Sequence, residues 1–199
     1  MGRTRLLGRA VLRSVALAII ALIAAPAAGA NQVDDDKAKK VKIAYLYNFS
    51  RYIDWPTVAF SQSDAPFAVG VLGDDPFGSK LDKLAKKKFG GERPIVIRRF
   101  ASWEEYEACH VLFIPSGAGA DLGSRAIEGT RDLPLLIVSD VGSTTELSPP
   151  IRLYLDADGT IGFEVNLTET RQRKLKIDAK LLKLARVVDP GSTRPSQDF

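Results

Sequence analysis

Four short apolar runs in the middle of the chain constrain its fold more than any other feature. They lie at residues 66–72 (PFAVGVL), 94–98 (PIVIR), 110–114 (HVLFI) and 134–138 (PLLIV). A run of this length that lacks alternating polar residues is typical of a strand buried on both faces of a sheet. Helices are expected between these strands, at residues 75–88, at residues 102–108 and after the glycine-rich residues 116–119. Strands that alternate with helices predict right-handed crossovers and a mostly parallel sheet.

The pattern changes after residue 150. Two apolar segments, residues 151–155 and 160–165, flank the sequence DADG, whose composition is typical of a hairpin turn. A calcium loop is the alternative for this turn, but it requires further oxygen ligands. A last helix is expected from residues 166–168 to Ala185. The predicted fold class is therefore α/β, a single domain with a mostly parallel sheet, an antiparallel edge hairpin and helices on both faces.

The first thirty residues have the pattern of a signal peptide. Four arginines precede an apolar run at residues 15–25, and Ala28-Gly29-Ala30 supplies the small residues after which signal peptidase cuts. A membrane anchor is the alternative, although an unbroken run this short hardly spans a bilayer. We expect secretion with cleavage near Ala30, then a flexible lead-in at residues 31–40 and a loose tail at residues 189–199.

The charge balance argues against a nucleic-acid-binding function. The chain carries 28 basic and 24 acidic side chains, and removal of the four arginines of the leader makes the two signs equal. A nucleic-acid site requires a clustered positive field. The local run at residues 86–88 (KKK) is more typical of the solvated end of a helix.

The chain has one cysteine, Cys109, and one histidine, His110. A single thiol cannot form an internal disulfide, so Cys109 is expected to be a small buried residue, with an intermolecular disulfide as the alternative. A single histidine beside a strand argues against a Ser-His-Asp triad and against a histidine-based metal site. We expect no catalytic residue, no cofactor and no metal.

An aromatic helix is expected at residues 41–56 (VKIAYLYNFSRYIDWP) and should end near Asp54 or Trp55, because Pro56 disfavours helical geometry before it. Its apolar face recurs at steps of three and four residues. Large aromatic side chains anchor both cores and interfaces, so this stripe either packs in the core or in part faces a partner. The stripe consists of Val41, Ala44, Tyr45, Asn48, Phe49, Tyr52 and Ile53.

A second candidate site lies where the first and fourth strands end. Gly73, Asp74 and Asp75 follow the first strand, and Ser139 and Asp140 follow the fourth. Open α/β sheets bind ligands beyond the carboxyl ends of their strands, so this edge is a candidate small-molecule site. The alternative is a tight turn with a helix cap, because the loop lacks the lysine of a P-loop and the third strand lacks the aspartate of a receiver domain.

Several segments together resemble the YfiR family, in the same order and with matching spacing. The resemblance extends from about Val41 to Val188. The segments are residues 44–49 (AYLYNF) with Trp55-Pro56, 70–77 (GVLGDDPF), 109–114 (CHVLFI), Ser139-Asp140, 163–166 (FEVN) and 180–185 (KLLKLA).

The resemblance implies a periplasmic regulator rather than an enzyme. Its best-understood relatives bind the periplasmic sensor domain of an inner-membrane diguanylate cyclase and hold that cyclase inactive, which lowers cyclic di-GMP and biofilm formation. Relatives also form homodimers, so a homodimer without nucleic acid and without membrane insertion after signal cleavage is implied here. The alternative function is a periplasmic small-molecule-binding protein that uses residues 73–77 and Ser139-Asp140.

We expect the partner interface to contain five aromatic-helix residues and one acidic residue. Glu164 lies in the strand-like residues 161–165, so it either points to a solvated face or pairs with Arg171 or Arg173. Relatives that use disulfides have paired cysteines, whereas this chain has one, and residues 144–146 (TTE) with Pro149-Pro150 replace an aromatic residue and a glycine pair of the family. The predicted interface residues are Tyr45, Asn48, Phe49, Tyr52, Trp55 and Glu164.

Overall fold

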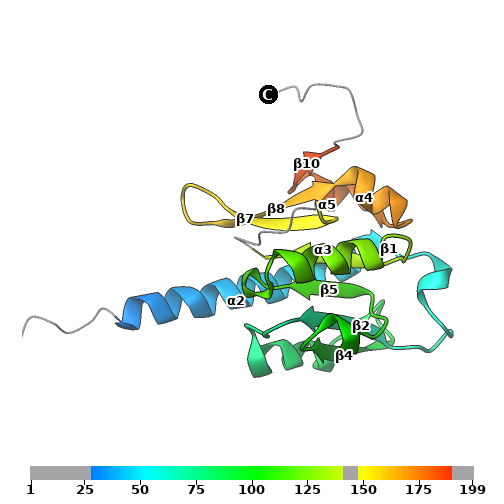
Figure 1. The fold of residues 1–199 in the computed structure, drawn as a ribbon, viewed down its shortest axis with the longest axis horizontal. Coiled ribbons are helices and arrows are strands. Elements are labelled where there is room, and N and C mark those ends of the chain that lie inside the picture. Colours follow the sequence, from blue (N-terminus) through cyan, green and yellow to red (C-terminus); the bar gives the residue numbers. More distant parts are fainter. Residues whose placement is uncertain (1–27, 141–147, 190–199) are drawn as a thin grey trace, which may run out of the picture. The chain divides into compact units, whose positions relative to one another are not determined.

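The computed structural model describes residues 28–140 and 148–189 (Figure 1). The chain divides into a first unit, Met1–Lys37, and a second unit, Ala38–Phe199. In the first unit the described residues, 28–37, form the beginning of helix α2. Most of the predicted signal peptide, residues 144–146 and nearly all of the predicted tail lie outside the described residues. None of the helices described is long and apolar enough to cross a membrane.

Helix α2 (Ala28–Arg51) begins earlier than the sequence predicted. Residues 31–40 were expected to form a flexible lead-in, whereas the structure shows them as helix. Asp35 and Asp36 precede Lys39 and Lys40 by four residues, a spacing at which opposite charges stabilise a helix. The polar composition that suggested a flexible segment is equally suited to a solvated helix.

An eight-stranded sheet forms the body of the second unit, in the order β10-β8-β7-β6-β5-β2-β4-β3. The four predicted apolar strands are confirmed as β2, β4, β5 and β6, and every neighbouring pair among them is parallel. Burial along the whole strand explains the unbroken apolar sequences of β2, β5 and β6, whereas in β4 only Ile95 and Phe100 are buried. The strands are β2 (Phe67–Leu72), β3 (Lys88–Phe89), β4 (Arg93–Phe100), β5 (Val111–Ile114), β6 (Leu136–Ser139), β7 (Ile151–Leu155), β8 (Ile161–Asn166) and β10 (Arg186–Val188).

Strands β7 and β8 form the predicted antiparallel hairpin, with Leu153 opposite Phe163. The backbone N–H of Asp156 donates to the carbonyl of Thr160 (2.8 Å), and Gly159 has a φ of 82°, as a hairpin turn requires. The hairpin is not the outermost element of the sheet, however, because β10 pairs with β8 in parallel beyond it.

The single last helix predicted after the hairpin is instead divided into α4 (Leu167–Gln172) and α5 (Ala179–Leu182). A short strand, β9 (Lys176–Ile177), lies between them and pairs antiparallel with β1 (Ile53–Asp54), which directly follows α2. Helix α4 ends before Lys174, whose φ of 58° is left-handed. Leu175 and Leu181 of this region are buried in the core. Their tertiary packing overrides the helical periodicity of the sequence.

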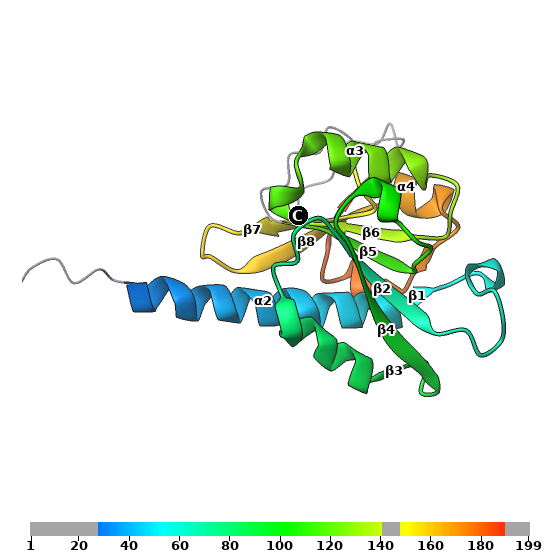
Figure 2. The same cartoon turned by 60° about the horizontal axis from the view of Figure 1, so that its bottom comes forward.

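Helices cover both faces of the sheet, as predicted (Figure 2). Side chains of β5 alternate between two apolar cores: Val111 and Phe113 join one, and Leu112 and Ile114 join the other. The first core also contains residues of α2 and η3, and the second contains residues of α3. These remaining helices are α3 (Ala120–Gly129), η2 (Thr57–Ala59), η3 (Gly78–Lys86), η4 (Trp103–Glu105) and η5 (Ser116–Ala118).

Candidate functional site

The predicted aromatic stripe of α2 is largely a core element. Phe49 is fully buried, and its ring stacks on Tyr45 at 5.6 Å and meets the edge of Phe163 at 5.1 Å. The Tyr45 hydroxyl donates to the Ile161 carbonyl (2.7 Å), and burial raises the pKa of this phenol. These contacts fasten α2 to strand β8 from within the domain. We therefore do not retain Phe49 among the partner contacts.

The buried face of α2 is also rotated from the predicted one. Leu46 and Ser50 are buried although neither belongs to the predicted stripe, and Ala44, which does, is exposed. Asn48 and Tyr52 are half-buried, and the Tyr52 backbone N–H donates to the Asn48 carbonyl (3.1 Å). These two side chains therefore retain surface that a partner can reach.

Trp55 opens onto a pocket at the carboxyl end of α2. Its Nε1 donates to the Ser50 carbonyl (3.2 Å), and its ring meets the edges of Phe67 at 5.3 Å and His110 at 5.8 Å. One part of this half-buried ring is thus fixed by the core. The rest of the ring lines the pocket, so Trp55 contacts both the core and the pocket.

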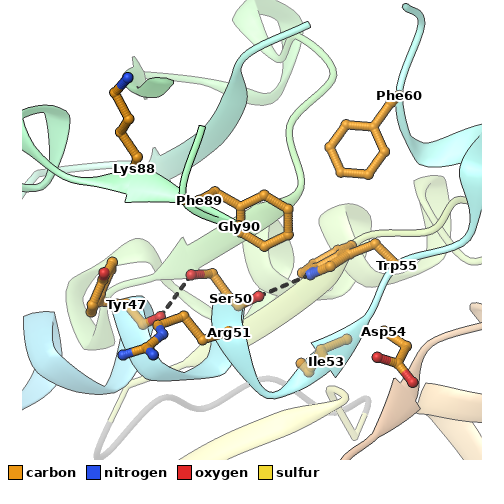
Figure 3. A pocket seen from close by; sticks show the side chains of 11 residues that line it. Tyr47, Ser50, Arg51, Ile53, Asp54, Trp55, Phe60, Lys88, Phe89 and Gly90 are labelled. Atoms are coloured by element: carbon orange, nitrogen blue, oxygen red, sulfur yellow. Dashed lines mark hydrogen bonds between the residues drawn. The ribbon is translucent and has the colours of Figure 1, made fainter. Parts of the chain in front are cut away.

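The pocket has a volume of about 600 Å³ and lies between the end of α2 and strand β3 (Figure 3). In Figure 3, Tyr47, Arg51 and Lys88 lie toward one side of it and Trp55 and Phe60 toward the other. We call it the cationic pocket. Its lining consists of Tyr47, Ser50, Arg51, Ile53, Asp54, Trp55, Phe60, Lys88, Phe89, Gly90 and Gly91.

Positive charge gathers on one side of the cationic pocket. The Arg51 guanidinium lies 5.7 Å from the centre of the Tyr47 ring, and the Lys87 ammonium lies 4.9 Å from it, both within the range of cation–π contacts. Within residues 28–140 and 148–189, neither of these cations nor Lys88 forms an ion pair. By contrast, Arg99 is paired with both Asp75 and Asp82 at 2.7 Å.

Most of this lining was not predicted. Trp55 is the one predicted interface residue in it. Tyr47 and Arg51 lie four residues apart and so share a helix face, but neither belongs to the predicted apolar stripe. The lysine run at residues 86–88 was interpreted as a helix end, and η3 does end at Lys86. The last lysine of the run begins β3, which brings Phe89 to the pocket.

Glu164 lies on β8, where buried and half-buried residues alternate, so it occupies the more solvated face. Its register partners are Arg152 on β7 and Arg186 on β10. The cations expected for it are engaged elsewhere: Arg171 pairs with Asp189 at 3.1 Å, and Arg173 is buried against the end of α3. Glu164 is not among the residues that line the cationic pocket.

The first half of the predicted sheet-edge site is a turn that its own residues satisfy. The Asp75 carboxylate accepts from the Phe77 backbone N–H (2.7 Å) and from the Arg99 guanidinium (2.7 Å). Gly73 has a φ of 91° and donates its N–H to the Phe100 carbonyl (2.8 Å), while Asp74 is exposed. This geometry favours the turn-and-cap alternative.

The second half of the sheet-edge site lies beyond β5, which separates β2 from β6. Asp140 is buried and lies 2.6 Å from the Lys42 ammonium. Ser139 is also buried, and its hydroxyl has no hydrogen-bond partner among the residues described. The Asp140 carboxylate, which was expected to contact a ligand, is thus paired with the Lys42 ammonium of the same chain.

Cys109, which is half-buried, and His110, which is buried, directly precede strand β5. Burial raises the pKa of the Cys109 thiol to about 12, which disfavours the reactive thiolate. The Nδ1 atom of His110 accepts from the Ala68 backbone N–H (3.0 Å), and its ring lies 4.6 Å from both Phe60 and Phe67. Among the residues described, no three His, Cys, Asp or Glu side chains are placed to hold a metal ion.

Comparison with protein families places the chain beside known relatives. The model of a family described as YfiR/HmsC-like matches residues 39–186, which include strands β2 to β8 of the eight-stranded sheet and end at the first residue of β10. No curated protein sequence matches the chain.

Proposed function

The chain belongs to the YfiR/HmsC-like family, and from this premise we propose that it is a non-enzymatic periplasmic regulator. It binds the periplasmic sensor domain of an inner-membrane diguanylate cyclase and restrains that cyclase. The consequences are lower cyclic di-GMP and less biofilm. It acts as a homodimer, reaches the periplasm through its signal peptide and does not remain inserted in the membrane.

The family match is the observation that carries this proposal, because it extends over residues 39–186 and so includes all of the eight-stranded sheet except most of β10. The leader sequence supports secretion, since its arginines, apolar run and Ala28-Gly29-Ala30 have the order of a signal peptide. The equal numbers of basic and acidic residues after the leader are consistent with a protein partner rather than a nucleic acid.

Regulation of this kind is stoichiometric. A ligand shifts a two-state equilibrium only as far as its affinities for the two states differ. The regulator must therefore bind the inactive conformation of the sensor domain more tightly than the active one. Release follows from any signal that reverses this preference.

Deletion of the gene in the native host tests the proposal, with cellular cyclic di-GMP as the measurement. The expected result is a rise on deletion that a complementing copy reverses. A copy that lacks residues 1–30 is the matched control, because it should be produced without reaching the periplasm and should not restore repression. Unchanged cyclic di-GMP after deletion contradicts the proposal.

A small-molecule-binding function at the sheet edge has less support. Asp75 and Asp140 were its two most promising carboxylates, and both are occupied by intramolecular cations at 2.6–2.7 Å. A thermal shift with nucleotides or amphiphiles would reveal such a ligand, because native-state binding raises stability.

A further inference from the structure

We propose that the cationic pocket binds an extended acidic segment of the membrane partner, which inserts one aromatic or large apolar side chain between Trp55, Phe60 and Phe89. This inference rests on the proposed function for the identity of the partner. It adds the place of binding and the chemistry of the bound segment.

The charges of the pocket select an anionic occupant. Arg51 and Lys88 line the pocket and Lys87 lies beside it, and all three are exposed. In the described part of the chain these three cations have no carboxylate within ion-pair distance, whereas the exposed Arg99 has two. Asp54 is the one acidic residue of the lining. Asp and Glu side chains of a partner would therefore meet uncompensated positive charge.

The aromatic side of the pocket selects an apolar side chain. The Phe89 ring stacks on the buried Phe67 at 4.2 Å, and Phe60 lies 4.6 Å from His110, so both rings are held in place by the core. The Trp55 ring is fixed by its hydrogen bond to Ser50. Rigid aromatic rings at the end of a pocket form the kind of anchor site that dominates protein–protein affinity.

The backbone beside the pocket favours a peptide over a small anion. Strand β3 ends the eight-stranded sheet, so one of its edges has no neighbouring strand in the described part of the chain. Gly90 and Gly91 form the turn from β3 to β4 with φ of 60° and 86°, and open space surrounds the position of a Cβ atom on either residue. An extended segment can approach this backbone closely and pair with an exposed sheet edge. A small anion would use the cations but not this edge.

Site-specific photocrosslinking in the native host tests the proposal. A benzoylphenylalanine replaces Tyr47 in the full chain, and the same residue at the exposed Leu155 on the β7–β8 hairpin is the control. Mapping of the adducts by mass spectrometry should place the Tyr47 adduct on an acidic, aromatic-containing segment in the periplasmic domain of an inner-membrane protein. The Leu155 adduct should not map to that segment.

Charge reversal provides the second arm. The double variant Arg51→Glu/Lys88→Glu should lower the yield of the Tyr47 adduct at least tenfold, and Arg51→Lys/Lys88→Arg should retain it. The matched control is Lys83→Glu/Lys180→Glu, which reverses two exposed lysines outside the pocket and should leave the yield unchanged. Because all four positions are exposed, the variants should keep the thermal unfolding temperature of the natural chain.

The outcomes separate this inference from the proposed function. If deletion leaves cyclic di-GMP unchanged but the Tyr47 adduct forms on an acidic membrane-protein segment, the pocket assignment stands and the cyclase proposal fails. If deletion raises cyclic di-GMP but the Arg51→Glu/Lys88→Glu variant represses normally, the pocket assignment is overturned. Adducts that map to a second copy of the chain, or to no protein, also overturn it.

Discussion

The Nζ atom of Lys42 lies 2.6 Å from Oδ1 of Asp140, so helix α2 is joined to the residue that follows strand β6. The two side chains are 17% and 5% exposed, and the pair is thus removed from most solvent screening. The same helix carries Tyr47 and Arg51 of the cationic pocket roughly one and a half and two and a half turns further on. The ion pair therefore helps to fix the helix that presents the proposed binding residues.

Replacement of Lys42 by Met should lower the free energy of unfolding by roughly 2–4 kcal/mol, because it leaves the Asp140 carboxylate buried without this cation. Urea denaturation gives the change. Lys40→Met is the matched control, since Lys40 lies on the same helix and is exposed; it should change stability by less than about 0.5 kcal/mol. An equal effect of the two replacements would show that the ion pair does not support the fold.

Replacement of Phe49 by Ala should destabilise the domain by about 3–5 kcal/mol, the usual cost of removing a buried aromatic ring. The ring is fully buried between Tyr45 and Phe163. Thermal and urea unfolding measure the loss. Val58→Ala, at a side chain that is 75% exposed, is the control and should have little effect. A Phe49→Ala variant with natural stability and weakened partner binding would return Phe49 to the interface.

The strands could be predicted because a strand that is buried on both faces has apolar residues at every position. The run at Val111–Ile114 is apolar at every position since one core receives its odd residues and the other its even residues. The last helix could not be predicted in the same way. Its periodicity is real, but Lys174 is left-handed and Leu175 is buried, and these are consequences of long-range packing.

The aromatic helix shows how far the residues of the candidate site could be predicted from the sequence. Its periodicity predicted that α2 has an apolar face, yet periodicity does not say which aromatic residues are completely covered. Phe49 is covered by Phe163, which lies more than a hundred residues further along the chain. The cationic pocket depends on a similar long-range relation, because Lys88 and Phe89 reach Trp55 through the pairing of β3 with β4.

Replacement of Arg173 by Lys should lower the free energy of unfolding by about 2–4 kcal/mol, because an ammonium cannot reproduce a planar, multiply bonded guanidinium in a buried site. The Arg173 guanidinium is fully buried and donates to the carbonyls of Thr130 (2.6 Å) and Ile127 (2.9 Å). These carbonyls belong to the end of α3, so the side chain serves as its cap. Arg171→Lys, at an exposed position on α4, is the control and should be nearly neutral. Equal unfolding midpoints for both variants would contradict this role.

His110 should make the free energy of unfolding of the domain depend on pH between 6.5 and about 4. It is the one histidine of the chain, so no other imidazole titrates in this window. Burial lowers the pKa of this imidazole from 6.5 to about 4, and the cations Arg93 and Arg98 act in the same direction. The nearby carbonyl of Ala59 favours the charged ring and offsets the shift in part. Around the ring, Trp55, Phe60 and Phe67 supply no charge that would stabilise an imidazolium.

The sign of the effect follows from proton uptake by the unfolded chain. Above pH 6.5 the imidazole of His110 is neutral in both states, and its contribution to stability is complete. Between pH 6.5 and about 4 the unfolded chain binds a proton that the folded domain does not, so stability falls by roughly 3 kcal/mol in total. His110→Phe keeps a ring and removes the titration. Urea unfolding at several pH values should therefore give a flatter profile between pH 5 and 6.5 for this variant, and because His110 is the one histidine of the chain, an unchanged slope would assign the pH dependence to carboxylates instead.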